Sequence, residues 1–148
     1  MKDMNNQSLD IATLVKTQKK GFALTQPFYL SDAVFEKDVD SFFYQDWQMA
    51  GHVSEIPQAG DYFLFEMMKE SVIIVRGKDG TVHALANVCR HRGSRVCIEP
   101  RGNTKRFTCP YHAWAFNLDG SLFNARMLDE DHDRSKLGLK RVAVEVFH

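Results

Sequence analysis

Two short segments of the chain each place one cysteine and one histidine at a spacing typical of metal ligands. The first is Cys89-Arg90-His91 and the second is Cys109-Pro110-Tyr111-His112, with residues 92–108 between them. A thiolate and a neutral imidazole both bind transition metals, so each segment supplies one sulfur and one nitrogen. Together the segments predict a metal centre with mixed sulfur and nitrogen ligands.

This ligand set fits two kinds of metal centre unequally. In a Rieske [2Fe-2S] cluster two histidines replace two cysteines on one iron, which raises the reduction potential above that of an all-cysteine cluster. A structural zinc site usually pairs cysteine with cysteine and histidine with histidine. Each segment here is mixed, which favours the [2Fe-2S] cluster. Cys89 and Cys109 are the expected ligands of the inner iron, and His91 and His112 those of the outer iron.

Residues near the ligands add three expectations. Gly93 and Pro110 suit the tight backbone of two ligand loops. Cys97 is left without a partner once the other cysteines bind metal, so no intrachain disulfide is available and Cys97 is expected to be a small buried residue. Ala113 and Trp114 follow the last ligand and offer no hydroxyl to the cluster sulfurs, which favours a potential at the low end of the Rieske range.

The stretch between the two segments is basic in a chain whose formal net charge is zero. Glu99 is its single acid, and its cations, here called the basic collar, are Arg90, Arg92, Arg95, Arg101, Lys105 and Arg106. Surface charge of one sign speeds association with a partner of opposite charge. The basic collar is therefore expected to fix the loops by hydrogen bonds, to dock an acidic electron donor or neighbouring subunit, or both.

Length and composition indicate one domain with an appended arm. The chain has 148 residues, of which 44% are apolar, and it lacks the run of ~18 apolar residues that a transmembrane helix needs. Residues 1–8 do not have the apolar stretch of a secretory signal. The expectation is a cytoplasmic protein that binds neither membrane nor nucleic acid.

The elements that position the ligands change character near residue 47. Ser8 is the expected N-cap of a helix that ends near Lys20, and Ser31 is that of a second helix over residues 32–46. Apolar side chains recur along the second helix at a period of 3.6 and are expected to pack in a core: Phe35, Val39, Phe42 and Phe43. Residues 1–46 are therefore predicted to form a helical arm.

From Trp47 onward, apolar residues alternate with a period of two, which predicts strands. Strands are expected at 47–56, 62–67, 71–76, 81–87, 106–109, 113–118, 122–123 and 141–147, with turns at 78–80 and 119–120. The acidic segment 125–138 is predicted to be a loop. Residues 47–148 are therefore predicted to be a mainly β domain with the metal-binding segments in loops.

These residues resemble the Rieske domain in the α subunits of Rieske non-haem iron oxygenases. The resemblance rests on Cys89-Arg90-His91-Arg92-Gly93, on Cys109-Pro110-Tyr111-His112 with Trp114, and on Gln26-Pro27-Phe28-Tyr29, Gly60-Asp61-Tyr62-Phe63 and Ile73-Ile74-Val75-Arg76-Gly77. With the block 89–97, they resemble the branch that acts on quaternary ammonium compounds, such as the glycine betaine monooxygenases. The resemblance implies a Rieske-type antiparallel β-sandwich with a cluster-binding subdomain and an N-terminal helical arm.

The resemblance also implies a function. In this family the cluster relays electrons from a flavin- or ferredoxin-type reductase to a mononuclear Fe(II), where O2 is activated for monooxygenation or demethylation. Two histidines and a carboxylate hold that iron in a C-terminal domain, and the full-length protein is expected to be a homotrimer. This chain ends before that domain, so the mononuclear iron is expected only in the full-length protein. No catalytic residue is assigned, and residues 129–133 around His132 are expected to be a solvated loop.

Two other functions compete with the oxygenase domain. A freestanding Rieske ferredoxin would be an electron carrier, but the helical arm argues against it because small ferredoxins resemble only the β part. A zinc-stabilised interaction module belongs to another class, and a visible absorption spectrum distinguishes it from both cluster proteins.

Overall fold

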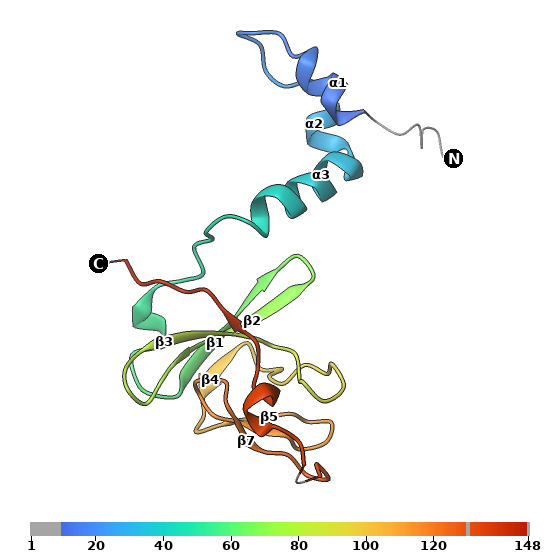
Figure 1. Cartoon of the computed structure of the whole chain (residues 1–148). Helices are drawn as coiled ribbons and strands as arrows, with labels where there is room; N and C mark the ends of the chain where they lie inside the picture. The colour runs from blue at the N-terminus through green and yellow to red at the C-terminus, as the bar shows by residue number, and fades with distance from the viewer. Residues whose placement is uncertain (1–9, 130, 148) are drawn as a thin grey trace. The chain divides into compact units, whose positions relative to one another are not determined.

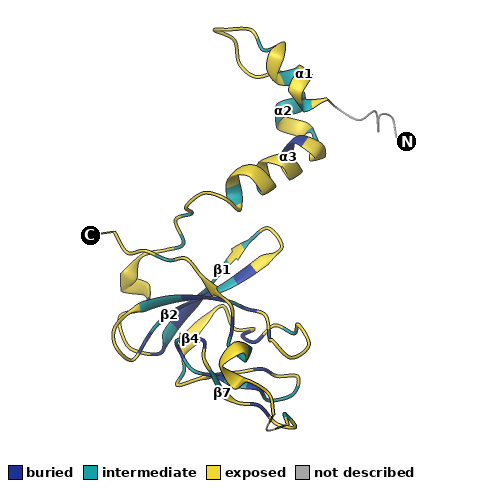
Figure 2. Ribbon diagram, viewed as in Figure 1, coloured by how far each residue is buried: buried dark blue, intermediate teal, exposed yellow. Residues whose placement is uncertain are grey.

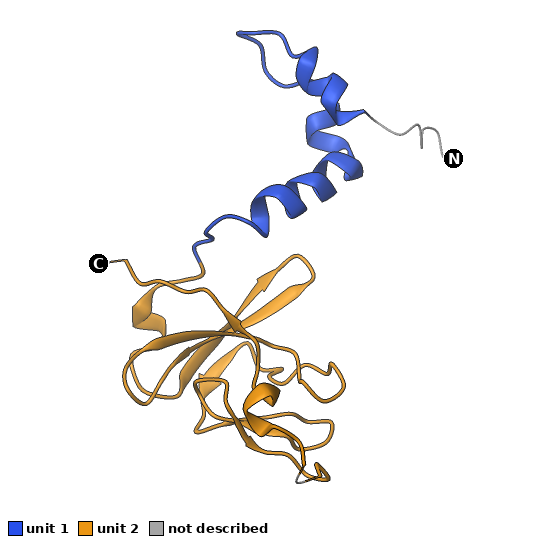
Figure 3. Cartoon of the chain, in the orientation of Figure 1, with its two compact units in different colours: residues 1–49 blue, residues 50–148 orange. Residues whose placement is uncertain are grey.

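Figure 1 shows a computed structural model of the chain, which describes residues 10–129 and 131–147. The chain divides into two compact units, Met1–Met49 and Ala50–His148 (Figure 3). The sequence places the same division a few residues earlier, at 46/47.

Unit 1 is helical. Its elements are α1 (Ile11–Lys16), α2 (Pro27–Leu30), α3 (Asp32–Asp38) and the π-helix η1 (Val39–Phe43). Asp10 caps α1 by accepting a hydrogen bond from the backbone N–H of Ala12. The expected cap, Ser8, lies outside the described residues, and α1 ends at Lys16 rather than near Lys20.

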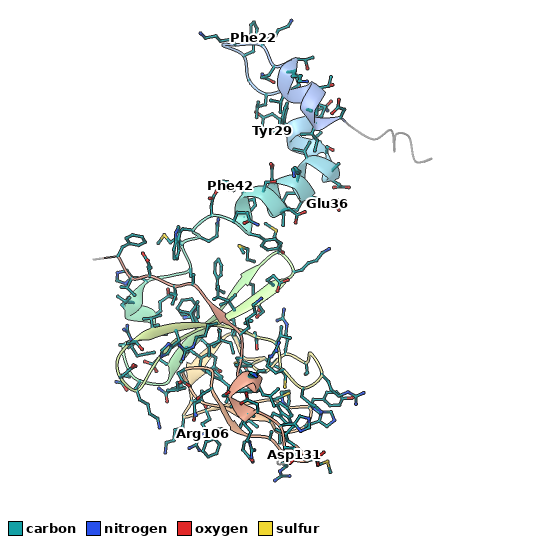
Figure 4. All side chains as sticks on the ribbon, in the orientation of Figure 1. Phe22, Tyr29, Glu36, Phe42, Arg106 and Asp131 are labelled. Atoms are coloured by element: carbon teal, nitrogen blue, oxygen red, sulfur yellow. The ribbon has the colours of Figure 1, made fainter. Side chains whose placement is uncertain are left out.

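The second predicted helix begins where expected but changes its winding. α3 starts at Asp32 after Ser31, and at Val39 the chain passes into the wider turn of η1. A π-helical turn moves later side chains out of a 3.6-residue register, so the apolar stripe is not continuous. The predicted core packing is wrong for Phe35 and Phe42, which are 51% and 54% exposed. Phe42 is labelled in Figure 4, and Figure 2 shows that most of unit 1 is exposed. Val34 is the buried side chain instead.

Unit 2 consists of two antiparallel sheets (Figure 1). The large sheet has the order β4-β1-β2-β3-β8, and the small sheet has the order β5-β6-β7. The strands are β1 (Asp61–Met67), β2 (Glu70–Arg76), β3 (Val82–Ala86), β4 (Arg101–Asn103), β5 (Phe107–Thr108), β6 (Ala115–Phe116), β7 (Leu122–Asn124) and β8 (Arg141–Val142). The predicted mainly β, antiparallel fold is confirmed.

The sequence locates most of these strands, with three differences. Residues 47–56 form no strand, because His52 and Glu55 cap a short 3-10 turn, η2 (Val53–Glu55), through reciprocal side-chain hydrogen bonds. β8 covers two residues rather than seven. β4 was not predicted, because Arg101-Gly102-Asn103 has no apolar residue to give a period. The turn at 78–80 is present, with Gly80 at φ +82° and the Gly77 N–H bonded to the Thr81 carbonyl.

Alternate residues of the large sheet face opposite sides, as strand geometry requires. Ile73 and Val75 point into the larger core, which also contains residues of the small sheet such as Phe116. Ile74 points to a second cluster with Phe63 on the opposite face. The larger core lies against both sheets and includes all three cysteine side chains, so it is the part of the fold that positions the candidate site.

No helix among the described residues is long and apolar enough to cross a bilayer.

Candidate metal centre

The four predicted ligands lie on two loops. Loop 1, residues 89–94, follows β3 of the large sheet, and loop 2, residues 109–114, joins β5 to β6 in the small sheet. The structure brings the loops together, because the ring centroids of His91 and His112 are 4.6 Å apart. The Cys89 and Cys109 thiols also lie within hydrogen-bond reach of each other.

Loop 1 is closed by two backbone hydrogen bonds. The Cys89 N–H donates to the Ser94 carbonyl at 2.8 Å, and the Gly93 N–H donates to the Cys89 carbonyl at 3.0 Å. Gly93 has a φ of +71°, in the left-handed region that glycine adopts without strain. The tight backbone expected at Gly93 is confirmed.

Loop 2 repeats this pattern at the same offsets from its cysteine. The Cys109 N–H donates to the Trp114 carbonyl at 2.8 Å, and the Ala113 N–H donates to the Cys109 carbonyl at 3.0 Å. Ala113 occupies the position equivalent to Gly93 and has a φ of +57°. Two loops with different ligand spacing therefore share one backbone frame.

The thiols and imidazoles are separated by depth. Cys89 and Cys109 are 3% and 2% exposed, whereas His91 is exposed and His112 is half-buried. The two imidazole rings meet edge to face, at an interplanar angle of 79°. Sulfur ligands inside and nitrogen ligands outside match the expected inner and outer irons.

Two opposing effects act on the Cys89 thiol, and together they raise its pKa. Burial raises the pKa of the Cys89 thiol, and the neighbouring Cys109 thiol raises it further. The backbone N–H groups of His91 and Arg92 act in the opposite direction, because they donate hydrogen bonds to the Cys89 sulfur. Such donors stabilise a thiolate, which is the metal-binding form.

At His112, by contrast, the pKa shift favours the metal-binding form of the side chain. Burial lowers its pKa first, and the nearby His91 and Arg92 lower it further. A neutral imidazole is the form that binds a metal. The electrostatics of this residue therefore fits a ligand rather than a surface cation.

Two buried nitrogen atoms at the site have no hydrogen-bond partner among the described residues: His112 Nδ1 and Trp114 Nε1. Buried polar atoms in proteins are nearly always paired, so an orphaned ring nitrogen fits a metal ligand. No three or more His, Cys, Asp or Glu side chains in the described part of the chain converge as they would around a single ion. The four candidate ligands instead form a thiol pair and an imidazole pair, which fits one pair on each iron of the proposed cluster.

Asn87, which does not belong to either metal-binding segment, supports loop 1. Its side chain is fully buried. The amide nitrogen donates to Ser71 Oγ at 3.0 Å and to the Cys97 carbonyl at 2.7 Å. Its oxygen accepts from the N–H groups of Val96 and Cys97 at 3.0 and 2.8 Å. The residues on either side of loop 1 are thereby tied together at its base. The signal in the sequence for this role is that Asn87 places a single amide side chain at the end of an otherwise largely apolar predicted strand.

Aromatic rings of loop 2 cover both imidazoles. Trp114 stacks on His91, with centroids 4.9 Å apart and an interplanar angle of 12°. Tyr111 lies over His112, with centroids 3.8 Å apart and an angle of 37°. The Arg92 guanidinium lies 6.0 Å from the centre of the Tyr111 ring. Trp114 of loop 2 therefore contacts a candidate ligand of loop 1, whereas Tyr111 contacts one in its own loop.

The basic collar divides into structural and free cations. Arg95 makes two hydrogen bonds to the Glu66 carboxylate, at 3.0 and 3.1 Å. The Arg106 guanidinium lies 3.5 Å from the centre of the Phe123 ring (Figure 4). These two cations are engaged within unit 2, so part of the collar has the expected structural role.

Among the described residues, Arg90, Arg101 and Lys105 make no ion pair. Arg90 lines a shallow depression of about 360 Å³ with Lys136, Gly138 and Lys140. Its neighbour in the chain is the candidate ligand His91, so cations gather beside the candidate centre.

Cys97 and His132 are not part of either ligand loop. Cys97 is buried as predicted, at 8% exposure, and its thiol contacts the Glu99 carbonyl at 3.6 Å. His132 is exposed in a polar segment, where Asp133 caps the 3-10 turn η3 (Arg134–Leu137).

A model of the Rieske [2Fe-2S] domain matches residues 46–143 of this chain. The match covers both ligand loops and most of unit 2.

Three relatives are similar in sequence. The glycine betaine monooxygenase oxygenase subunit of Pseudomonas aeruginosa is 39% identical over 135 residues, which are 90% of this chain and 32% of that protein. The carnitine monooxygenase oxygenase subunit of Acinetobacter baumannii is 40% identical over 123 residues, 81% of this chain and 33% of that protein. The biphenyl 2,3-dioxygenase subunit alpha of Rhodococcus jostii is 39% identical over 113 residues, 76% of this chain and 24% of that protein.

Solved structures are similar as well. The quaternary ammonium Rieske monooxygenase CntA, in complex with L-carnitine, superposes with a TM-score of 0.75 at 39% identity, covering 80% of this chain and 34% of that one. A naphthalene 1,2-dioxygenase variant superposes with a TM-score of 0.81 at 33% identity, covering 88% of this chain and 30% of that one. The chain spans about a quarter to a third of the length of these relatives and solved structures.

Proposed function

Because this chain belongs to the Rieske [2Fe-2S] domain family, we propose that it acts as the electron-relay domain of an oxygenase α subunit. The predicted resemblance to such subunits is confirmed by the relatives and by the fold. The observation that carries the proposal is the pairing of two buried thiols with two outer imidazoles on loops of equal backbone geometry.

In this proposal the ligand roles follow from depth. Cys89 and Cys109 hold the inner iron, and His91 and His112 hold the outer iron. The cluster, when bound, takes up and releases one electron at a time. The protein keeps the sulfurs dry within the core, donates backbone N–H groups to Cys89 and leaves His91 at the surface. His91 is therefore the ligand at which an electron enters or leaves with the least intervening protein.

The reaction served by the electron is proposed from the relatives. Several are named as oxygenase subunits for glycine betaine or carnitine. We propose that the full protein acts on a quaternary ammonium compound at a mononuclear Fe(II) in a domain that follows this one. The freestanding ferredoxin is the weaker proposal, because these relatives are oxygenase subunits and their alignments extend over 81–90% of the chain.

The proposed electron donor is a flavin- or ferredoxin-type reductase with an acidic surface. Arg90, Lys136 and Lys140 line one depression, and Arg90 precedes His91 in the chain. Cations at an interface rim act mainly on the rate of association. A homotrimer and a cytoplasmic location remain part of the proposal for the full protein.

The experiment that tests the function is anaerobic reconstitution of the purified chain with iron and sulfide. The expected product is red-brown, contains two irons and two acid-labile sulfides per chain, and gives a rhombic EPR spectrum of a mixed His/Cys cluster when reduced. His91→Ala and His112→Ala are expected to lose the cluster. A chain that takes up one zinc ion and no sulfide would reject the proposal in favour of the zinc module.

A further inference from the structure

The exposed ligand candidate of loop 1 is covered by an aromatic residue of loop 2. The Trp114 indole lies nearly parallel to the His91 imidazole, at 12°, with 4.9 Å between the ring centres. Trp114 itself is only 4% exposed and belongs to the larger core. One face of an otherwise exposed ligand is therefore covered by a ring that is anchored in the protein interior.

The anchor is built into the frame of loop 2. The Trp114 carbonyl accepts the hydrogen bond from the Cys109 N–H that closes this loop. The backbone that fixes Cys109 thus also fixes the indole that touches His91. The stack is consequently a link between loops that arise from different sheets.

Ordinary core packing would place Trp114 in the interior without any such contact. Phe116 illustrates this case, since it is fully buried in the same core. Core packing alone requires volume and hydrophobicity, whereas the near-parallel geometry at a ligand ring adds an orientation. Substitution can separate the two roles of Trp114. A branched aliphatic side chain can take its place in core packing, whereas only another flat ring can take its place in the stack on His91.

We propose that Trp114 is a positioning residue, which orients His91 for the outer iron and excludes water from one face of that ligand. The inference rests on the proposed ligand set. Ring orientation and solvent access at a ligand set the electronic properties of a bound metal, and solvent exposure is one determinant of the potential of an iron–sulfur cluster. The reduced state carries the additional negative charge, and water stabilises it, so removing the indole should raise the midpoint potential.

The test compares Trp114→Leu, Trp114→Phe and Phe116→Leu in the full chain, after reconstitution with iron and sulfide. Trp114→Leu removes the flat ring but keeps an apolar side chain, and it should raise the midpoint potential and change the EPR g-values. Trp114→Phe restores a flat ring and should return both quantities most of the way to wild type. Phe116→Leu is the matched control, which should lower the melting temperature while the potential and g-values stay at wild type.

The outcomes separate this inference from the function on which it depends. A wild-type chain that binds no [2Fe-2S] cluster rejects the proposed function itself. A wild-type chain that binds the cluster, with Trp114→Leu unchanged in potential and g-values, rejects the positioning role alone. An equal shift in Phe116→Leu, or no recovery in Trp114→Phe, would also reject it, because packing and not the stacked ring would then set the properties of the cluster.

Discussion

At the scale of single residues, ligand geometry depends on a side chain that is not itself a ligand. The Asn87 amide uses both hydrogens and accepts two more hydrogen bonds, all inside the protein. Its partners come from β2 and from the segment just after loop 1. A buried amide with all its hydrogen bonds formed specifies one arrangement of the chain, so Asn87 fixes the base of loop 1.

Asn87→Ala should lower the free energy of unfolding by about 3 kcal/mol or more, because it leaves several buried backbone groups unpaired at about 1–3 kcal/mol each. It should also weaken retention of the cluster. Chemical denaturation and the iron content after gel filtration measure the two effects. Cys97→Ala is the control, since Asn87 binds the Cys97 backbone and not its thiol; that variant should keep the cluster. Full iron content in Asn87→Ala would show that loop 1 does not need this support.

At the scale of elements, the two ligand loops share the same backbone hydrogen-bond pattern. Each closes by hydrogen bonds at the same offsets from its cysteine, and each needs a positive φ four residues after it. Gly93 meets this requirement freely, whereas Ala113 meets it against a steric cost of about 1–2 kcal/mol. The second loop therefore carries local strain that the first does not.

Ala113→Gly should relieve that strain and stabilise the protein by about 0.5–1 kcal/mol, after the greater chain entropy of glycine is subtracted. Gly93→Ala should destabilise it by a similar amount, although open space surrounds that position. Urea denaturation of the two variants gives both values. Destabilisation by Ala113→Gly would mean that the alanine methyl contributes more by packing than it costs in backbone strain.

Three aspartates build the same local structure at turns of unit 2. Asp79, Asp119 and Asp133 each accept hydrogen bonds from the N–H and the hydroxyl of the residue two positions later. These bonds lower the pKa of each carboxyl group. Asp119 also lies 3.6 Å from Arg141 Nη2, so its turn is tied to the strand β8.

The lowered pKa of Asp119 gives a stability that depends on pH. The pKa of Asp119 in the folded state is below the unfolded value of ~3.9. At a pH between these two pKa values, the folded state therefore binds fewer protons than the unfolded state. The stabilisation is complete above the unfolded pKa and is lost as the pH falls through the folded pKa. Wild type should therefore be more stable than Asp119→Asn at pH 7, and the difference should shrink as the pH falls below ~3.9 and vanish below the folded pKa of Asp119. Denaturation across pH 2–7 measures this, with the exposed Asp129→Asn as control. A difference independent of pH would exclude ionisation as the cause.

The sequence predicts elements well where one period of apolar residues extends over a whole element. β1, β2 and β3 alternate over several residues and lie where expected. Residues 47–56 also alternate, but His52 and Glu55 make local side-chain hydrogen bonds that compete with a strand. The four ligand candidates were readable from residue type and spacing. Asn87 and the Trp114 stack were not, because they depend on contacts between segments distant in sequence.

At the scale of the whole molecule, charge is arranged unevenly around unit 2. Arg90, Lys136 and Lys140 line one depression, to which loop 1 contributes Arg90, although the chain has no formal net charge. Lys78 lies in the turn between β2 and β3, at the end of β3 opposite the ligand loop. Lys140, which is bonded to Ala86 at the end of β3 that leads into loop 1, is therefore a suitable test residue. Lys78, near the other end of β3, is its control.

Lys140→Glu should slow reduction of the cluster by an acidic donor at low ionic strength, because it reverses a charge in the cationic depression that includes Arg90 of loop 1. Lys78→Glu makes the same change in net charge and should leave the rate near that of wild type. The gap should close as salt is added, since charges are screened within ~8 Å at physiological ionic strength. Stopped-flow reduction over a salt series, with a redox titration of each variant, tests this. Equal slowing by both variants would assign the effect to net charge rather than to this face.

The origin of the two loops from different sheets has a mechanical consequence. A cluster bound between Cys89 and His112 would be a cross-link that closes a loop of residues 90–111, which contains β4 and β5. If the holo chain is pulled by its ends, the enclosed residues cannot extend until an iron–ligand bond breaks. About 22 residues extend to roughly 80 Å, so force spectroscopy should find holo molecules shorter than apo molecules by that length before rupture. The force at which the missing length appears would then report the strength of iron–ligand bonds in a single molecule.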